Sequence, residues 1–155
     1  LPLDAHSEIG HNAILASMLN MKNIQSFCEY HGINIGMAGQ LPAPKTATEI
    51  AEIFEQELNC EARIFNDSGN KINSAGIVSG GGGTDGLFSS ANDGFDCYIT
   101  GEFYHSMWHP AKEIGIPVIA LGHYKSETPG VIAVMKELSE KFSLETVFAD
   151  IPTGL

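Results

Sequence analysis

Hydrophobic residues follow a helical period early in the chain and a strand–helix alternation later. The clearest helix is predicted after Thr46, because Thr46 and Glu49 have the spacing of a capping box and four apolar residues then recur on one face. The residues of this apolar stripe are Ile50, Ile53, Phe54 and Leu58. Their spacing predicts a helix that packs one side against a core.

The N-terminal part of the chain predicts a helix followed by a hairpin. Within residues 1–21, apolar side chains recur at roughly helical spacing, and Ser7 is a suitable N-cap. Residues 27–30 and 33–38 predict two short strands, and the His31-Gly32 pair between them favours a turn.

The remainder of the chain alternates between strand and helix patterns. Apolar runs predict strands at residues 62–65, 75–78, 95–99, 117–121 and 145–149. Segments of helical pattern lie at residues 85–91, 104–114 and 130–142. This order is typical of an α/β fold with a mostly parallel sheet flanked by helices. Because no linker or repeat interrupts it, residues 1–155 are expected to form a single region.

The charge balance narrows the choice of ligands. The chain has 8 basic and 19 acidic residues, so its formal net charge is 8 − 19 = −11. Eight scattered cations cannot form the basic face that direct nucleic-acid binding requires. The hydrophobic content of 43% excludes a disordered acidic tail. An acidic surface suits a cationic ligand, or an anionic ligand that binds through a metal.

Neither a membrane span nor a disulfide framework is indicated. No apolar run approaches the roughly 20 residues of a spanning helix, so we expect a soluble protein without membrane association. Cys28, Cys60 and Cys97 are odd in number and not in zinc-finger spacing, which favours a reducing cytoplasm.

Reactive side chains gather in the loops that would follow the predicted parallel strands, where ligands bind in such sheets. In the loop of residues 122–127, His123 and Glu127 could converge on one divalent cation. Alternatively, His123 caps a neighbouring strand and Glu127 stabilises a helix N-terminus. The spacing alone leaves both interpretations open.

The loop of residues 101–105 offers a possible acid/base pair. If a helix begins near Glu102, Glu102 and His105 share a face and could transfer a proton or orient a metal-bound water. The alternative is a partly buried ion pair. His109, beside Pro110, is expected only to pack.

The loop of residues 79–84 is rich in glycine. Gly81, Gly83 and Gly86 match the dinucleotide-binding fingerprint in form, and such a nucleotide-binding domain would place Glu102 on a ribose. The match carries little weight in a run this rich in glycine. The glycines could instead make room for a bulky group, including a ligand phosphate.

The opening motif places four potential ligands within eight residues: Asp4, His6, Glu8 and His11. On a helix that starts at Ser7, Glu8 shares a face with His11, whereas Asp4 lies before the helix and is free to reach another loop. The alternative is a solvated acidic helix start.

Three motifs together resemble the Nif-three-like family (NGG-one-interacting factor three-like), also called type-two GTP cyclohydrolase I homologues. They are Pro2-Leu3-Asp4-Ala5-His6 with Asn12, then Thr100-Gly101-Glu102 with Tyr104-His105, then Gly122-His123-Tyr124 with Ser126-Glu127. The resemblance covers essentially the whole chain.

This resemblance implies a Nif-three-like α/β fold, a homo-oligomer and a dinuclear centre of divalent zinc, iron or manganese. It implies Asp4, His123 and Glu127 as metal ligands, with Glu102 and His105 beside the metals as catalytic acid/base residues. The family also has a His-His pair upstream of the first motif. Because this chain begins at Leu1, we expect it to be the C-terminal portion of a longer protein.

The function expected from the resemblance is metal-dependent hydrolysis of a nucleotide or phosphoester, of the GTP cyclohydrolase type-two kind. No residue in the motifs selects guanine. The alternative is a non-catalytic metal-binding regulatory or scaffold protein.

Overall fold

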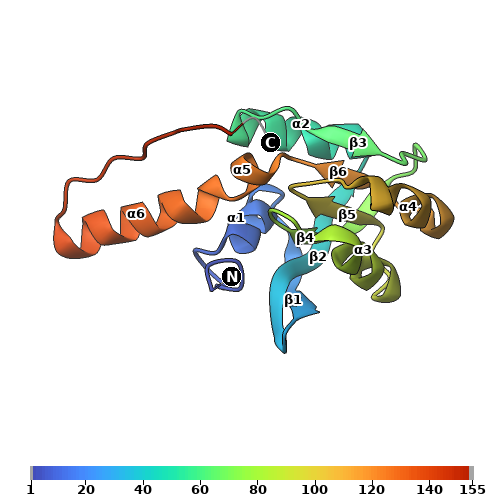
Figure 1. The fold of residues 1–155 in the computed structure, drawn as a ribbon, viewed down its shortest axis with the longest axis horizontal. Helices are drawn as coiled ribbons and strands as arrows, with labels where there is room; N and C mark the ends of the chain where they lie inside the picture. Colours follow the sequence, from blue (N-terminus) through green and yellow to red (C-terminus); the bar gives the residue numbers. More distant parts are fainter. Residues whose placement is uncertain (1, 154–155) are drawn as a thin grey trace.

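The computed structural model describes residues 2–153, which form a sheet flanked by helices (Figure 1). The strands are β1 (Lys22–Tyr30), β2 (Ile33–Lys45), β3 (Arg63–Phe65), β4 (Ile72–Val78), β5 (Cys97–Thr100) and β6 (Val118–Ala120). The α-helices are α1 (His11–Met18), α2 (Ala47–Leu58), α3 (Gly83–Asn92), α4 (Trp108–Ile114), α5 (His123–Ser126) and α6 (Thr128–Phe142). A 3-10 turn, η1 (His105–Met107), precedes α4.

The sheet is mixed, which corrects the prediction of a mostly parallel sheet. Its strand order is β1-β2-β4-β5-β6-β3, and only the β4–β5 and β5–β6 pairs among the described strands are parallel. The β1–β2, β2–β4 and β3–β6 pairs are antiparallel. The physical reason is that the long β1–β2 hairpin and the short strand β3 extend the sheet at its two edges, whereas the parallel pairs are joined through helices.

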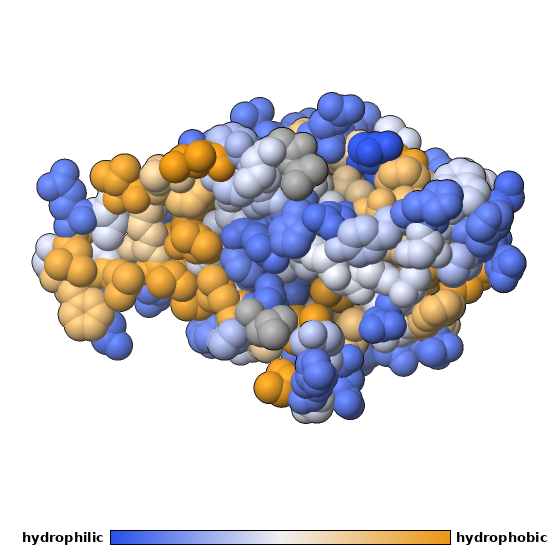
Figure 2. All heavy atoms as spheres, viewed as in Figure 1, coloured by the Kyte–Doolittle hydropathy of each residue, from blue (hydrophilic) through white to orange (hydrophobic). Residues whose placement is uncertain are grey.

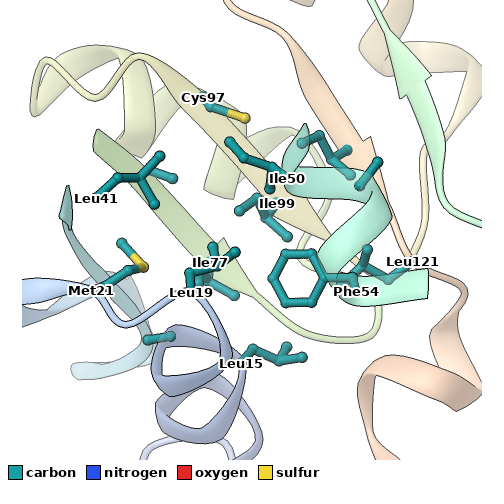
Figure 3. Close-up of a cluster of buried hydrophobic side chains, with 14 of the residues drawn as sticks. Leu15, Leu19, Met21, Leu41, Ile50, Phe54, Ile77, Cys97, Ile99 and Leu121 are labelled. Atoms are coloured by element: carbon teal, nitrogen blue, oxygen red, sulfur yellow. The ribbon is translucent and has the colours of Figure 1, made fainter. Parts of the chain in front are cut away.

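Successive residues of the central strands point to opposite faces and build two cores. On one face, Ile77, Ile99 and Ile119 pack with α1 and α2, a cluster that Figure 3 shows around Phe54. On the other face, Val78, Tyr98 and Val118 pack with residues of α3, η1 and α4. The sheet is therefore covered on both sides, as the strand–helix alternation predicts.

The two predicted helix starts differ in outcome. The capping box before α2 is confirmed, because Glu49 N donates to Thr46 Oγ1 (3.1 Å) and Thr46 N donates to Glu49 Oε2 (2.6 Å). Ser7 as an N-cap is wrong, because α1 begins at His11 with Gly10 as its N-cap. The imidazole of His6 caps the start of the turn at residues 7–9 instead, since its Nδ1 accepts from the backbone N–H groups of Glu8 and Ile9.

The predicted strand at residues 145–149 is also wrong, because residues 143–153 contain neither helix nor strand. Helix α6 projects from the body, and the segment after it runs back alongside it (Figure 1). Apolar side chains gather over both in Figure 2, and Val147 is 84% exposed. An apolar run becomes a strand only when a neighbouring strand pairs with it, and no strand of residues 2–153 does so here.

None of the helices in the described part of the chain combines the length and apolarity needed to cross a membrane. The three cysteines are free thiols, and burial raises the pKa of Cys97 well above its usual range.

The packing of α2 on the sheet gives a first testable prediction. Replacing Phe54, which is fully buried, with alanine should lower the free energy of unfolding by about 3–5 kcal/mol, because it leaves a cavity under α2. Phe88→Ala is the matched control on α3, where the ring is 45% exposed, and should cost below about 1 kcal/mol. Urea unfolding followed by circular dichroism measures both, and equal losses would contradict the arrangement.

Candidate functional site

Three loops meet at the carboxyl ends of the parallel strands β4, β5 and β6. Their backbones are joined directly, because Glu102 N donates to Gly80 O (3.0 Å) and Gly122 N donates to Gly101 O (2.9 Å). The buried hydroxyl of Ser126 accepts from Gly80 N at 2.9 Å. These bonds confirm that the loops predicted to carry the chemistry lie together.

The opening motif is bound to the same edge through Asn12, which is fully buried. Its Oδ1 accepts from Ser79 N (2.7 Å), and its Nδ2 donates to Ile35 O (2.7 Å) and Asp4 O (3.3 Å). The Ser79 hydroxyl then donates to Asp4 Oδ1 at 3.1 Å. Asp4 therefore reaches across to the loop after β4, as its position before α1 predicts.

His123 lies between two carboxylates. Its Nδ1 is 2.7 Å from Glu102 Oε1, and its Nε2 is 3.4 Å from Glu127 Oε1. An ionised carboxylate can only accept a hydrogen bond, so Nδ1 must carry the proton that it shares with Glu102. In the neutral imidazole, the lone pair then resides on Nε2, on the side of Glu127.

The electrostatics keep Glu102 ionised. A hydrogen bond from the Tyr104 hydroxyl is the main cause that lowers the pKa of Glu102, and the contact with His123 adds to it against the opposing effect of burial. The same hydrogen bond raises the pKa of Tyr104 to about 12. At neutral pH, Tyr104 is thus a donor and Glu102 an acceptor.

Asp4 and Glu127 line one cavity of about 420 Å³. The carboxylates at its wall are Asp4, Glu29, Asp85 and Glu127, and no Lys or Arg of the described residues lines it. Burial lowers the pKa of nearby His11, and both Asp4 and Glu127 oppose that shift through their charges. An acidic wall of this kind favours cations, in agreement with the net charge of the whole chain.

These donor groups do not enclose an ion in the described structure. Among residues 2–153, no three imidazole, carboxylate or thiol groups converge tightly enough to chelate a metal in this side-chain arrangement. Asp4 is instead bonded to Ser79, and His123 to Glu102. Binding one ion between Asp4, His123 and Glu127 would require these side chains to rearrange.

The glycines of the loop at residues 80–86 make room for other side chains. A Cβ at Gly80, where φ is +61°, would overlap Glu127 Oε1 and lie 3.1 Å from His123 Nε2. A Cβ at Gly81 would lie 2.6 Å from the Tyr104 hydroxyl. At Gly86, as at Gly82, it would overlap the hydroxyl of Tyr98.

This packing favours the steric interpretation of the glycines over the dinucleotide fingerprint. Two of the three fingerprint positions, Gly81 and Gly86, face tyrosine rings rather than open space. The Tyr98 hydroxyl is buried without a hydrogen-bond partner in the described structure. At these two positions, the glycines therefore make room for tyrosine side chains of the protein itself rather than for a ligand.

Several sequence candidates lie away from this cluster. Glu102 and His105 do not share a helix face, because no helix begins at Glu102 and η1 starts at His105. His105 is exposed and does not line the three cavities that Asp4, Glu102, His123 and Glu127 line. His109 is exposed rather than packed.

Three candidates of the opening motif also lie away from this cluster. His6 and Glu8 are exposed in the turn before α1. His11 is buried, and its Nδ1 accepts from Gly130 N at 3.1 Å, so it joins α1 to α6. The helix face predicted for Glu8 and His11 does not form, because α1 begins only at His11.

Sequence reasoning missed the roles of Ser79, Ser126 and Tyr104. Ser79 and Ser126 bind the loops together through their hydroxyls, and the Tyr104 side chain lies against the glycine loop. The signal for Tyr104 lay in the glycine run, because glycines opposite a strand end leave space for a large side chain from a neighbouring loop.

Fold and site together define an α/β protein with a polar site at the carboxyl ends of its parallel strands. The family model described as Duf34/NIF3 (NGG1p interacting factor 3) matches residues 1–154. The chain belongs to this family.

Relatives from several organisms agree with this assignment. A Pyrococcus horikoshii protein named GTP cyclohydrolase 1 type 2 homolog is 42% identical over 100% of this chain and 62% of its own length. An Archaeoglobus fulgidus protein of the same name is 39% identical over 100% of this chain and 61% of its own. The chain thus spans about three fifths of the length of these relatives.

Solved structures show the same fold. A protein named ybgI, described as of unknown function, aligns with a TM-score of 0.86 and 33% identity over 98% of this chain and 60% of its own. A Thermus thermophilus protein aligns with a TM-score of 0.80 and 32% identity over 100% of this chain and 60% of its own.

The glycine loop gives a second prediction. Gly86→Ala should lower the free energy of unfolding by about 1–3 kcal/mol, because the new methyl group meets the buried Tyr98 ring. Without that contact, alanine within a helix would stabilise the protein by about 1 kcal/mol.

A double-mutant cycle with Tyr98→Leu isolates the contact. The combined variant should lose less stability than the two single losses added together, as measured by urea unfolding. A gain of stability from Gly86→Ala alone would contradict the packing of Tyr98 on α3.

Proposed function

We propose that the chain contributes Asp4, His123 and Glu127 to a divalent-metal site that supports hydrolysis of a nucleotide or phosphoester. The observation that carries this proposal is the meeting of Asp4 and Glu127 at one acidic cavity, with His123 Nε2 3.4 Å from Glu127. Two carboxylates and one imidazole are a donor set that suits zinc, iron and manganese.

The chemistry of these side chains suits a divalent metal ion. Glu102 fixes the proton of His123 on Nδ1, so that the imidazole offers Nε2 as a ligand. Gly80 leaves the space in which the Glu127 carboxylate and His123 Nε2 approach each other. A bound metal would supply an activated water and polarise the reacting centre.

Glu102 is the residue best placed to accept a proton, since it is ionised, partly exposed and next to His123. His105, the second acid/base candidate, has no comparable support, because it is exposed away from the cavities. The geometry therefore favours Glu102 alone for proton transfer.

A dinuclear centre needs more donors than these three. Each divalent transition metal takes about four to six ligands, so further donors would come from other residues of the protein or from a second subunit of a homo-oligomer. The names of the relatives make GTP the first nucleotide to test.

Metal titration tests the site directly. Calorimetry with zinc and with manganese should show binding to the wild-type protein, and Asp4→Asn and Glu127→Gln should each weaken it by at least about 100-fold. This exceeds the 10- to 100-fold loss typical of residues beyond the ligands. Asp85→Asn is the matched control, because it removes a carboxylate from the same cavity without removing a proposed ligand.

Equal weakening by Asp4→Asn and Asp85→Asn would mean general charge attraction and would contradict coordination. Turnover is tested separately with metal-loaded protein, GTP and a chromogenic phosphoester. Metal binding without hydrolysis of either would contradict the enzyme and leave the regulatory metal-binding protein as the function.

A further inference from the structure

A second cavity, of about 630 Å³, adjoins the candidate metal site. Glu102, His123 and Glu127 line it, and Glu127 also lines the acidic cavity described above. The rest of its wall comes from α5, α6 and the segment after α6, and includes Val131 and Phe148. No Lys or Arg within the described part of the chain lines it. Glu127 thus borders an acidic cavity and a second cavity with apolar walls.

The segment after α6 forms this wall because it is bound to α5, although it contains neither helix nor strand (Figure 1). The Tyr124 hydroxyl donates to Asp150 Oδ1 and accepts from Ile151 N, both at 2.8 Å. Phe148 is half-buried and lines the cavity, whereas its neighbour Val147 is 84% exposed and does not line it. The fold therefore holds one aromatic side chain of an otherwise exposed segment at the cavity.

The size and the polar groups of the cavity indicate which ligand fits it. A closed cavity of roughly 150 Å³ holds one benzene ring, so 630 Å³ leaves room for a larger ring system. The Thr128 hydroxyl donates to Lys125 O at 3.0 Å, so it has only lone pairs left to offer a ligand. The ionised carboxylates of Glu102 and Glu127 also only accept hydrogen bonds. A matching ring therefore carries N–H donors.

We propose that this cavity binds an amino-bearing nucleobase, with the phosphates of the same nucleotide outside it. The inference rests on the proposed function, which leaves open a nucleotide and a simple phosphoester, and it selects the nucleotide. Val131 and Phe148 contact the ring, and its amino group donates to the acceptors of the wall. Phosphates stay outside, because the described lining residues include no Lys or Arg to offset the burial of their charge.

Amide proton–nitrogen spectra of the metal-free protein test this site without relying on the metal. Adenosine should shift the signals of Thr128, Val131 and Phe148 and leave unchanged that of Asp85, which lines the acidic cavity. Purine riboside lacks only the amino group and should bind at least about 10-fold more weakly, because it leaves an acceptor unpaired. Ribose 5-phosphate should shift none of these signals.

Variants of the wall give a second test. Val131→Trp should abolish the shifts, because the larger side chain fills the cavity from α6. Phe148→Ser should weaken adenosine binding by at least about 10-fold, because it removes the aromatic contact. Val147→Ser is the matched control and should leave the affinity unchanged, since Val147 does not line the cavity. Urea unfolding of each variant verifies that the fold is retained.

Three results would each overturn the proposal: no shift with adenosine, equal affinity for adenosine and purine riboside, or equal losses from Phe148→Ser and Val147→Ser. Failure of the proposed function gives a different result. If the protein binds neither zinc nor manganese but adenosine shifts these signals, the metal site is wrong and the nucleobase cavity stands. Metal binding without adenosine binding refutes the cavity alone.

Discussion

The packing around Gly80 is the constraint on which the site depends. Its backbone accepts from Glu102 N and donates to Ser126 Oγ, so it joins the loops after β4, β5 and β6. Its φ is +61°, and a Cβ there would overlap the Glu127 carboxylate. Any other residue at this position would both strain the backbone and displace a proposed ligand. The glycine thus couples the strand ends to the site chemistry.

The loops differ in what they contribute. The loop after β4 contributes backbone and space, whereas the loops after β5 and β6 contribute Glu102, His123 and Glu127. Asp4 arrives from the N-terminal motif because Asn12 bonds to both that motif and Ser79. The site is therefore assembled from segments far apart in sequence, and hydrogen bonds to buried polar groups hold them in register.

Much of this was predictable where the information is local or carried by motifs. The α2 capping box and the convergence of the three loops follow from spacing and from strand order. The sheet edges and the conformation of residues 145–149 were not predictable, because they depend on whether a distant strand pairs with them. The start of α1 was not predictable, because it depends on the turn that the imidazole of His6 caps. Tyr104 was missed because its role depends on glycines about 20 residues earlier, an interaction that spacing within one loop cannot report.

The central claim is that Asp4, His123 and Glu127 close on one divalent ion at the carboxyl ends of the parallel strands. Anomalous diffraction from zinc-soaked crystals, measured on both sides of the zinc absorption edge, tests it most directly. We predict a zinc-specific peak bounded by these three side chains, with the His123–Glu102 hydrogen bond retained. A map at saturating zinc without a peak there, or with its zinc held by other residues, would contradict the claim.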